Sequence, residues 1–270
     1  MFSDTDRREA LRSARRMELK SKAAFCAGVY AETAAAALSV SDAVPDPHFN
    51  RISVVHYELF DRDAFEACAG RMVPGTPHFI DVPHPVPERI RRLLIQKGYH
   101  STGESRASMM LTGDDIAPPP NRQVDISIAD GNTLDTFLEL FLNGFATPEH
   151  LMPLATAVFR ELVFQQCGPD NSRLYIGKYE GEPAATLYLF FEAHEGGINM
   201  VATREDLRGK GLATAMMRRA MADARALGIR LVSLEARWGG APERLYRRLG
   251  FATICRHEVF TNTPELKYGL

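Results

Sequence analysis

The stretch Glu205–Ala215, EDLRGKGLATA, places two glycines and two basic residues where a polar run gives way to an apolar helical pattern. Glycine lets a ligand approach the main chain closely. The first turn of a helix presents unpaired N–H groups that carry a partial positive charge. Because Arg208 and Lys210 add full charges beside the glycines, the pattern predicts that this stretch binds an anion.

The segments around this stretch predict alternating strands and helices. Upstream, strands are expected at 124–130, 173–180, 184–193 and 197–203, and helices at 132–145 and 149–166. The quoted stretch then opens a helix over 211–227, which Gly228 ends. Downstream, we expect a buried strand at 231–236, a helix from Pro242 to Gly250 and a strand at 251–260.

Two familiar phosphate-binding motifs fit the stretch poorly. A Walker A loop requires a glycine five positions before the Gly-Lys pair, and Arg204 stands there. A dinucleotide-binding fingerprint would use Gly209, Gly211 and an acidic residue downstream. However, Thr214 replaces its third small residue, and polar residues separate the preceding strand from the first glycine.

A third interpretation rests on two separate motifs. Arg208-x-x-Gly211-x-Ala213 resembles the acyl-CoA signature of the GNAT N-acetyltransferases, Gln/Arg-x-x-Gly-x-Gly/Ala. About thirty residues later, ERLYRRLGF is similar to the Leu-Tyr-x-x-Leu-Gly-Phe motif of the same family. The resemblance covers residues from about 123 to 260. It implies an α/β protein (an α+β mixed sheet) whose C-terminal domain, residues 121–270, is a catalytic N-acetyltransferase.

The resemblance also implies a co-substrate, acetyl-CoA, whose pyrophosphate suits main-chain N–H groups and basic side chains at a helix start. It further implies that the strand NMVAT, residues 199–203, splays from its neighbour, so that main-chain groups around Val201 and Thr203 bind the pantetheine amides like an added strand. The residues expected to hold coenzyme A are Val201, Ala202, Thr203, Arg208, Gly209, Lys210, Gly211, Leu212, Ala213 and Thr214. If this stretch binds no ligand, Arg208 and Lys210 are ordinary solvated surface charges.

Tyr246 is the residue to which the family motif assigns chemistry, because a phenol can donate a proton to the departing CoA thiolate. It could equally be a core aromatic of an amphipathic helix. Glu235 is a candidate to accept the proton of the attacking amine, and Glu192, His194 and Glu195 are further candidates. None of these four belongs to a fixed motif, and each could be a solvated charge.

The predicted activity is transfer of an acetyl group to a primary amine of a small molecule or peptide, by direct attack on the thioester. A non-catalytic acyl-CoA-binding module is the alternative, and a longer acyl group is another. Trp238, next to two glycines, either lines the acceptor pocket or covers the core edge. No residue selects among possible acceptor amines.

Composition excludes several other classes of function. A 45% hydrophobic content supports a well-buried core, and a net charge of −2 gives no sign of nucleic-acid or membrane-surface binding. The four cysteines are far apart in the sequence, so no disulfide framework or zinc site is predicted, and no metal is expected. The charged N-terminus lacks an apolar signal segment. We therefore expect a cytoplasmic protein, a monomer or homodimer.

Pro118–Pro120 predict a boundary between an N-terminal α/β domain, residues 1–120, and the catalytic domain. One long helix or two successive helices are expected over 4–39, then strands in 50–60 and 78–82 and helices in 62–72 and 87–98. VPERIRRLLIQKGY and APERLYRRLGF share a Pro-Glu-Arg start and a Gly-aromatic exit, which suggests duplication or chance. The N-terminal half resembles a degenerate GNAT domain, and Leu94 stands where a catalytic hydroxyl would be needed.

Overall fold

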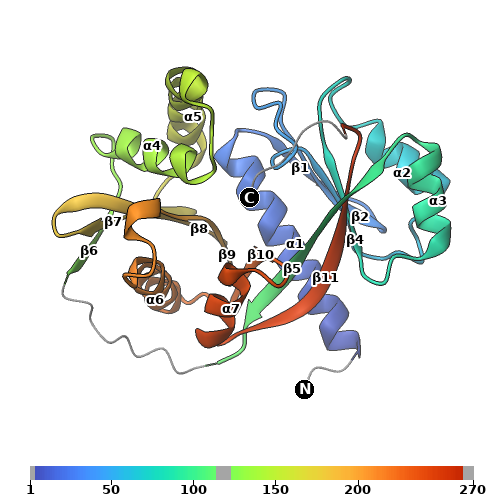
Figure 1. The fold of residues 1–270 in the computed structure, drawn as a ribbon. Helices are drawn as coiled ribbons and strands as arrows, with labels where there is room; N and C mark the ends of the chain where they lie inside the picture. The colour runs from blue at the N-terminus through green and yellow to red at the C-terminus, as the bar shows by residue number, and fades with distance from the viewer. Residues whose placement is uncertain (1–3, 114–122, 264–270) are drawn as a thin grey trace.

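One continuous mixed sheet runs through the computed structural model, which describes residues 4–113 and 123–263 (Figure 1). The N-terminal half contains α1 (Asp4–Phe25), β1 (Val29–Glu32), β2 (Ala36–Val40), β3 (Arg51–Val54), α2 (Arg62–Ala69), β4 (Phe79–Pro83), α3 (Glu88–Gln96) and β5 (His100–Leu111). The C-terminal half contains β6 (Val124–Ile128), α4 (Leu134–Gly144), α5 (Met152–Gln166), β7 (Ser172–Tyr179), β8 (Glu182–Glu192), β9 (Glu195–Thr203), α6 (Leu212–Ala226), β10 (Leu231–Arg237), α7 (Ala241–Arg248) and β11 (Phe251–Thr261). Short 3₁₀ turns at Glu149–Leu151 and Glu205–Leu207 precede α5 and α6.

The sheet has an internal symmetry in its strand order, β1-β2-β3-β4-β11-β5-β10-β9-β8-β7-β6. Each half has one parallel pair, β3 with β4 and β9 with β10, among antiparallel neighbours. The halves also exchange their last strands, because β11 pairs with β4 while β5 pairs with β10. The order β-β-β-α-β-α-β occurs in both halves, so the sheet agrees with a duplication.

Helices cover both faces of the C-terminal half of the sheet, with α6 on one side and α4 and α5 on the other (Figure 1). Successive side chains of a strand point to opposite faces of the sheet, so both faces carry apolar residues for helices to cover. Tyr175 packs with the α6 side, whereas its neighbours Leu174 and Ile176 pack with Phe137 of α4 and Phe25 of α1. A separate core gathers α2 and α3 against the N-terminal strands. Helix α1 therefore belongs to the N-terminal half in sequence but contributes to the core of the C-terminal half.

The prediction of helix throughout 4–39 was wrong after residue 25. The Ala-rich segment forms β1 and β2 instead, and Ala35, Ala36 and Ala37 are buried. Gly28 explains part of the preference, since a Cβ there would collide with the carbonyl of Val40 on the paired strand. Small residues let this hairpin pack closely, which overrides their helix propensity.

Strand β5 was not predicted at all, because its polar sequence shows no apolar alternation. The proposed boundary at Pro118–Pro120 lies outside the described residues, and the domain limits stay a prediction. No helix among the described residues is both long and apolar enough to cross a membrane.

Candidate active site

The turn between β9 and α6 forms the first part of the site; we call residues 208–214 the glycine turn. Gly209 and Gly211 both have left-handed backbone conformations, with φ of 81° and 84°. Helix α6 begins directly after Gly211, which provides no side-chain cap. The N–H of Ala215 donates to the carbonyl of Gly211 at 3.0 Å. The N–H groups of residues 211–214 therefore lack acceptors within the helix and face outward at its positive end.

Strands β9 and β10 separate next to the glycine turn. Their parallel pairing runs from Leu231 and Glu195 to Leu234 and Ile198 and then stops. A register shift between β8 and β9 and the left-handed Met200, with φ of 53°, mark a bulge at this point. The predicted splay of this strand is thus confirmed. Beyond Ile198, β9 pairs only with β8 among the described residues, so its other edge offers main-chain groups for an added strand.

The two basic side chains of the glycine turn differ in their surroundings. Arg208 is mostly exposed, and its Nε donates weakly to the carbonyl of Thr203 at 3.4 Å. The nearest carboxylate oxygen, from Glu205, is 3.9 Å away. Lys210 lies over the ring of Tyr179, with Nζ 4.7 Å from the ring centroid. Arg208 can therefore reorient toward an anion at low cost, whereas Lys210 already has a cation–π contact.

Tyr246 projects from α7 into the core beneath the sheet. Its ring packs 6.1 Å from that of Phe251, and only 6% of the residue is exposed. The hydroxyl has no hydrogen-bond partner among the described residues, and burial raises the pKa of Tyr246 well above its ordinary value. The phenol therefore stays protonated at physiological pH and has a free donor.

Glu235 lies on β10 beyond the last residue paired with β9, inside a cluster of arginines contributed by the N-terminal half. Arg15 of α1 donates to Oε2 at 2.6 Å, and Arg106 of β5 donates to Oε1 at 3.0 Å. Arg51 of β3 donates to both oxygens at 3.0 Å and also pairs with Asp81. Burial alone would raise the pKa of Glu235, but the charges of Arg51, Arg106 and Arg15 lower it well below its ordinary value. Both oxygens are thus committed to ion pairs.

The other candidate bases lie at the start of β9, whereas the glycine turn follows the end of that strand. Glu192 pairs with Lys20, and Glu195 forms a bidentate pair with Arg16, with contacts of 2.6 and 2.7 Å. His194 sits in the turn between β8 and β9, with Nδ1 3.3 Å from the carbonyl of Gly228. Thr203 lies eight positions after Glu195 along the strand, which corresponds to roughly 25 Å. These side chains anchor α1 and the turn rather than face the glycine turn.

Sequence reasoning missed the arginine cluster completely. Its members come from α1, β3 and β5, and no spacing in the sequence relates them to Glu235. It also missed the contact between α4 and β9, where a Cβ at Gly144 would collide with Ala202. A glycine at the end of an apolar helix was the available signal, but helix ends carry glycine for many reasons.

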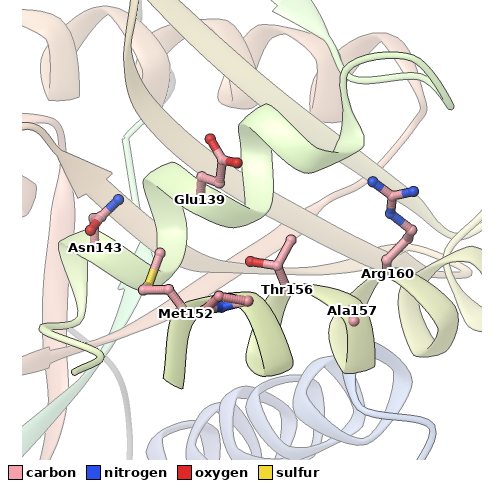
Figure 2. Close-up of a pocket in the computed structure, with 7 residues that line it drawn as sticks. Glu139, Asn143, Met152, Thr156, Ala157 and Arg160 are labelled. Atoms are coloured by element: carbon pink, nitrogen blue, oxygen red, sulfur yellow. The ribbon is translucent and has the colours of Figure 1, made fainter. Parts of the chain in front are cut away.

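A cavity of about 590 Å³ opens between α4 and α5. Figure 2 shows the lining residues, which include Glu139 and Asn143 on α4 and Met152, Thr156 and Arg160 on α5. None of the residues predicted to bind coenzyme A lines this cavity.

Comparisons with known proteins agree with this geometry. Residues 138–251 match the model of the acetyltransferase (GNAT) family. No curated protein matches the sequence significantly.

Solved structures with low sequence identity share the fold over nearly the whole chain. A GCN5-related N-acetyltransferase from Kribbella flavida has 15% identity and a TM-score of 0.63, with 92% of this chain and 95% of that chain covered. One from Sphaerobacter thermophilus has 19% identity and a TM-score of 0.59, with coverage of 84% and 80%. A tandem GNAT protein from the clavulanic acid biosynthesis pathway has 13% identity and a TM-score of 0.57, with coverage of 98% and 97%. Residues 138–251 of this chain thus match the GNAT acetyltransferase family, and the chain shares its overall fold with the two-domain structures of that family.

Proposed function

We propose that this protein is an acetyl-CoA-dependent N-acetyltransferase that acts on a primary amine of a small molecule or peptide. One observation carries the proposal: a helix start with two left-handed glycines lies at the end of a split between parallel strands. The first feature suits a pyrophosphate and the second suits an extended amide chain. Acetyl-CoA combines both chemical groups with an activated acetyl thioester.

Coenzyme A fits the groups that the chain offers. The outward N–H groups of residues 211–214 and the side chain of Arg208 would hold the pyrophosphate. Lys210 would contribute charge from its place over Tyr179. The free edge of β9 at Val201–Thr203 would hold the pantetheine amides by main-chain hydrogen bonds. The side chains of these three residues would therefore contribute little to binding. When bound, the thioester supplies the acetyl group and a sulfur leaving group.

Tyr246 would hold a proton for that sulfur. Its hydroxyl lacks a partner among the described residues, and its raised pKa keeps it protonated, so it can donate a hydrogen bond or a proton. Holding the sulfur and the amine in place would supply the remaining part of the rate enhancement.

We propose a different role for Glu235 than that of a base. A carboxylate that accepts from three guanidinium groups has a strongly lowered pKa and would be a weak proton acceptor. It would instead hold β10, one of the two strands that separate, against the N-terminal half. In that case the amine loses its proton to water or to a group of the acceptor itself.

Ligand-dependent thermal stability tests the cofactor assignment. Acetyl-CoA should raise the melting temperature, and NAD and ATP should have little effect, because binding only to the folded state stabilises it. Equal stabilisation by NAD would contradict the proposal.

Release of free thiol on mixing with acetyl-CoA and a library of amines tests the chemistry and identifies the acceptor. Binding of acetyl-CoA without thiol release from any amine would favour a non-catalytic acyl-CoA-binding module. The same assay with longer acyl-CoA thioesters tests the chain-length preference.

A further inference from the structure

A second concave surface, which shares no lining residue with the glycine turn, lies where the two halves meet at the edge of β11. This basic groove has a volume of about 560 Å³, within the range of small-molecule sites. Its walls come from the start of α1, the loop after β3, the end of β4, the loop after β10, α7 and the first part of β11. β4 pairs with β11 from His257 onward, and the N–H of His84 donates to the carbonyl of Arg256 at 2.8 Å, so residues 253–255 form an unpaired edge within the groove.

The groove carries an excess of positive charge. Four arginines line it, and Glu58 is the only acidic residue among the described lining residues. Arg8 and Glu58 form a long, exposed pair at 3.4 Å, which binds weakly. Arg247 is held by Glu243 at 2.7 Å. Arg7 and Arg256 thus supply the charge that is not already neutralised.

Arg256 and Arg7 have unused hydrogen-bond donors. Arg256 donates from Nη2 to Ser105 at 3.0 Å, but its Nε is shielded from solvent and has no acceptor among the described residues. A buried unsatisfied N–H is costly, so an acceptor at this position would be stabilising. Arg7 is exposed, and no described residue forms an ion pair with it. Guanidinium groups recognise carboxylate and phosphate with paired hydrogen bonds.

Aromatic side chains complete the groove. Trp238 is 39% exposed, and the guanidinium carbon of Arg256 lies 5.4 Å from the centroid of its ring. Tyr57, in the loop after β3, also lines the groove and is 38% exposed. Large rings exposed to this degree in a concave site offer flat surfaces on which another ring can stack.

We propose that the basic groove is a second ligand site, which binds a small molecule with a phosphate or carboxylate group and a flat ring. Arg256 and Arg7 hold the anion, and Trp238 stacks on the ring. The site uses residues of both halves and shares none with the glycine turn, so it stands independently of the acetyltransferase proposal.

Intrinsic fluorescence gives a direct test, because Trp238 is the single tryptophan of the chain. Phenyl phosphate and benzoate are titrated against the full-length protein, with phenol as the uncharged match. We expect saturable quenching by at least one anion, at concentrations at least tenfold below those that phenol needs. The anion that binds more tightly shows whether the natural ligand carries a phosphate or a carboxylate group. Equal quenching by phenol and by both anions would overturn the proposal.

Variants locate the binding groups. Arg256→Gln should weaken anion binding at least tenfold and Arg7→Gln about threefold, whereas Arg92→Gln, an exposed arginine on α3, should have no effect. Arg7 is exposed, so its variant remains informative even if Arg256→Gln fails to fold. The proposal would be overturned if Arg7→Gln kept wild-type affinity for the anion and Arg256→Gln either kept it as well or misfolded. Gly211→Val should bind the anion normally, and a comparable loss there would place the ligand at the glycine turn instead.

Discussion

Helices α2 and α6 occupy equivalent places in the two halves, yet their first turns have opposite electrostatic character. At the start of α2, the side chain of Asp61 accepts from the N–H of Ala64 at 2.9 Å, and Asp63 adds a second carboxylate. At the start of α6, Gly211 leaves the N–H groups uncapped. The N-terminal half thus fills with its own carboxylate the position at which the C-terminal half can accept a ligand's phosphate. A helix start is an anion site only where the chain does not supply the anion itself.

The helices that follow the parallel pairs show the same contrast. Both α3 and α7 lead into a left-handed glycine, Gly98 with φ of 83° and Gly250 with φ of 91°. Four residues earlier stand Leu94 and Tyr246, both buried in the cores of their halves. The shape of the helix exit is preserved, but only one half has a hydroxyl there.

The largest expected effect concerns the contact that joins the halves. Glu235→Gln should lower the free energy of unfolding by roughly 3–5 kcal/mol, because it leaves buried guanidinium groups without a counter-charge. Chemical denaturation measures this. Glu104→Gln is the matched control, since that carboxylate is 4.0 Å from Arg237 at the periphery and should matter little. A loss below about 1 kcal/mol for Glu235→Gln would mean that the cluster does not hold the halves together.

The same variant should change the pH dependence of stability. The folded-state pKa of Glu235 is lowered, so its contribution is fully present above the unfolded pKa of about 4.3 and is lost as pH falls through the folded value. The difference in unfolding free energy between wild type and Glu235→Gln should therefore be constant near neutral pH and should narrow only in acid. A gap that closes between pH 8 and pH 6 would contradict this assignment.

The second prediction tests whether the hydroxyl present in only one half performs chemistry. Tyr246→Phe keeps the ring against Phe251 and should lower turnover by roughly 10²-fold, with acetyl-CoA affinity retained. Steady-state kinetics on the identified amine measure this. Tyr30→Phe removes a hydroxyl bonded to Glu32 in the other half and should leave turnover unchanged. Turnover of Tyr246→Phe within about threefold of wild type would make Tyr246 a core aromatic only.

The third prediction tests the glycine turn. Gly211→Val should weaken acetyl-CoA binding roughly tenfold or more, because a β-branched residue disfavours the left-handed conformation and its Cβ obstructs the main chain. Calorimetric titration measures this. Gly75→Val, at a left-handed glycine of the N-terminal half with open space around it, carries similar strain and should leave the affinity unchanged. An unchanged affinity in Gly211→Val would place coenzyme A elsewhere.

The smallest expected effect is at the capped helix. Asp61→Ala should destabilise the protein by about 1 kcal/mol through loss of the N-cap. It should not create a second acetyl-CoA site, because the paired left-handed glycines are missing there. Thermal denaturation and the stoichiometry of acetyl-CoA binding measure the two expectations. Two molecules bound per chain would show that the carboxylate alone closed the N-terminal site.

The glycine turn, α6, α7 and the strands around them could be predicted from sequence because their signals are local. Gly211 marks the start of α6, and Gly250 marks the exit of α7. Strand β5 could not be predicted, since its polar residues, such as Arg106, are buried only by partners from distant segments. For the same reason, Glu235 looked like a possible base on its strand. Its surroundings depend on arginines that are far away in the chain.

The strand exchange has a consequence for the order in which the chain folds. β11 lies between β4 and β5, and the register pairs Phe251 with Leu111. While the chain is being synthesised, β4 therefore lacks its inner neighbour until the last strand leaves the ribosome. Until then, the N-terminal half exposes an unpaired strand edge, which invites pairing with other chains. Loss of the last strand would thus damage the half that was synthesised first.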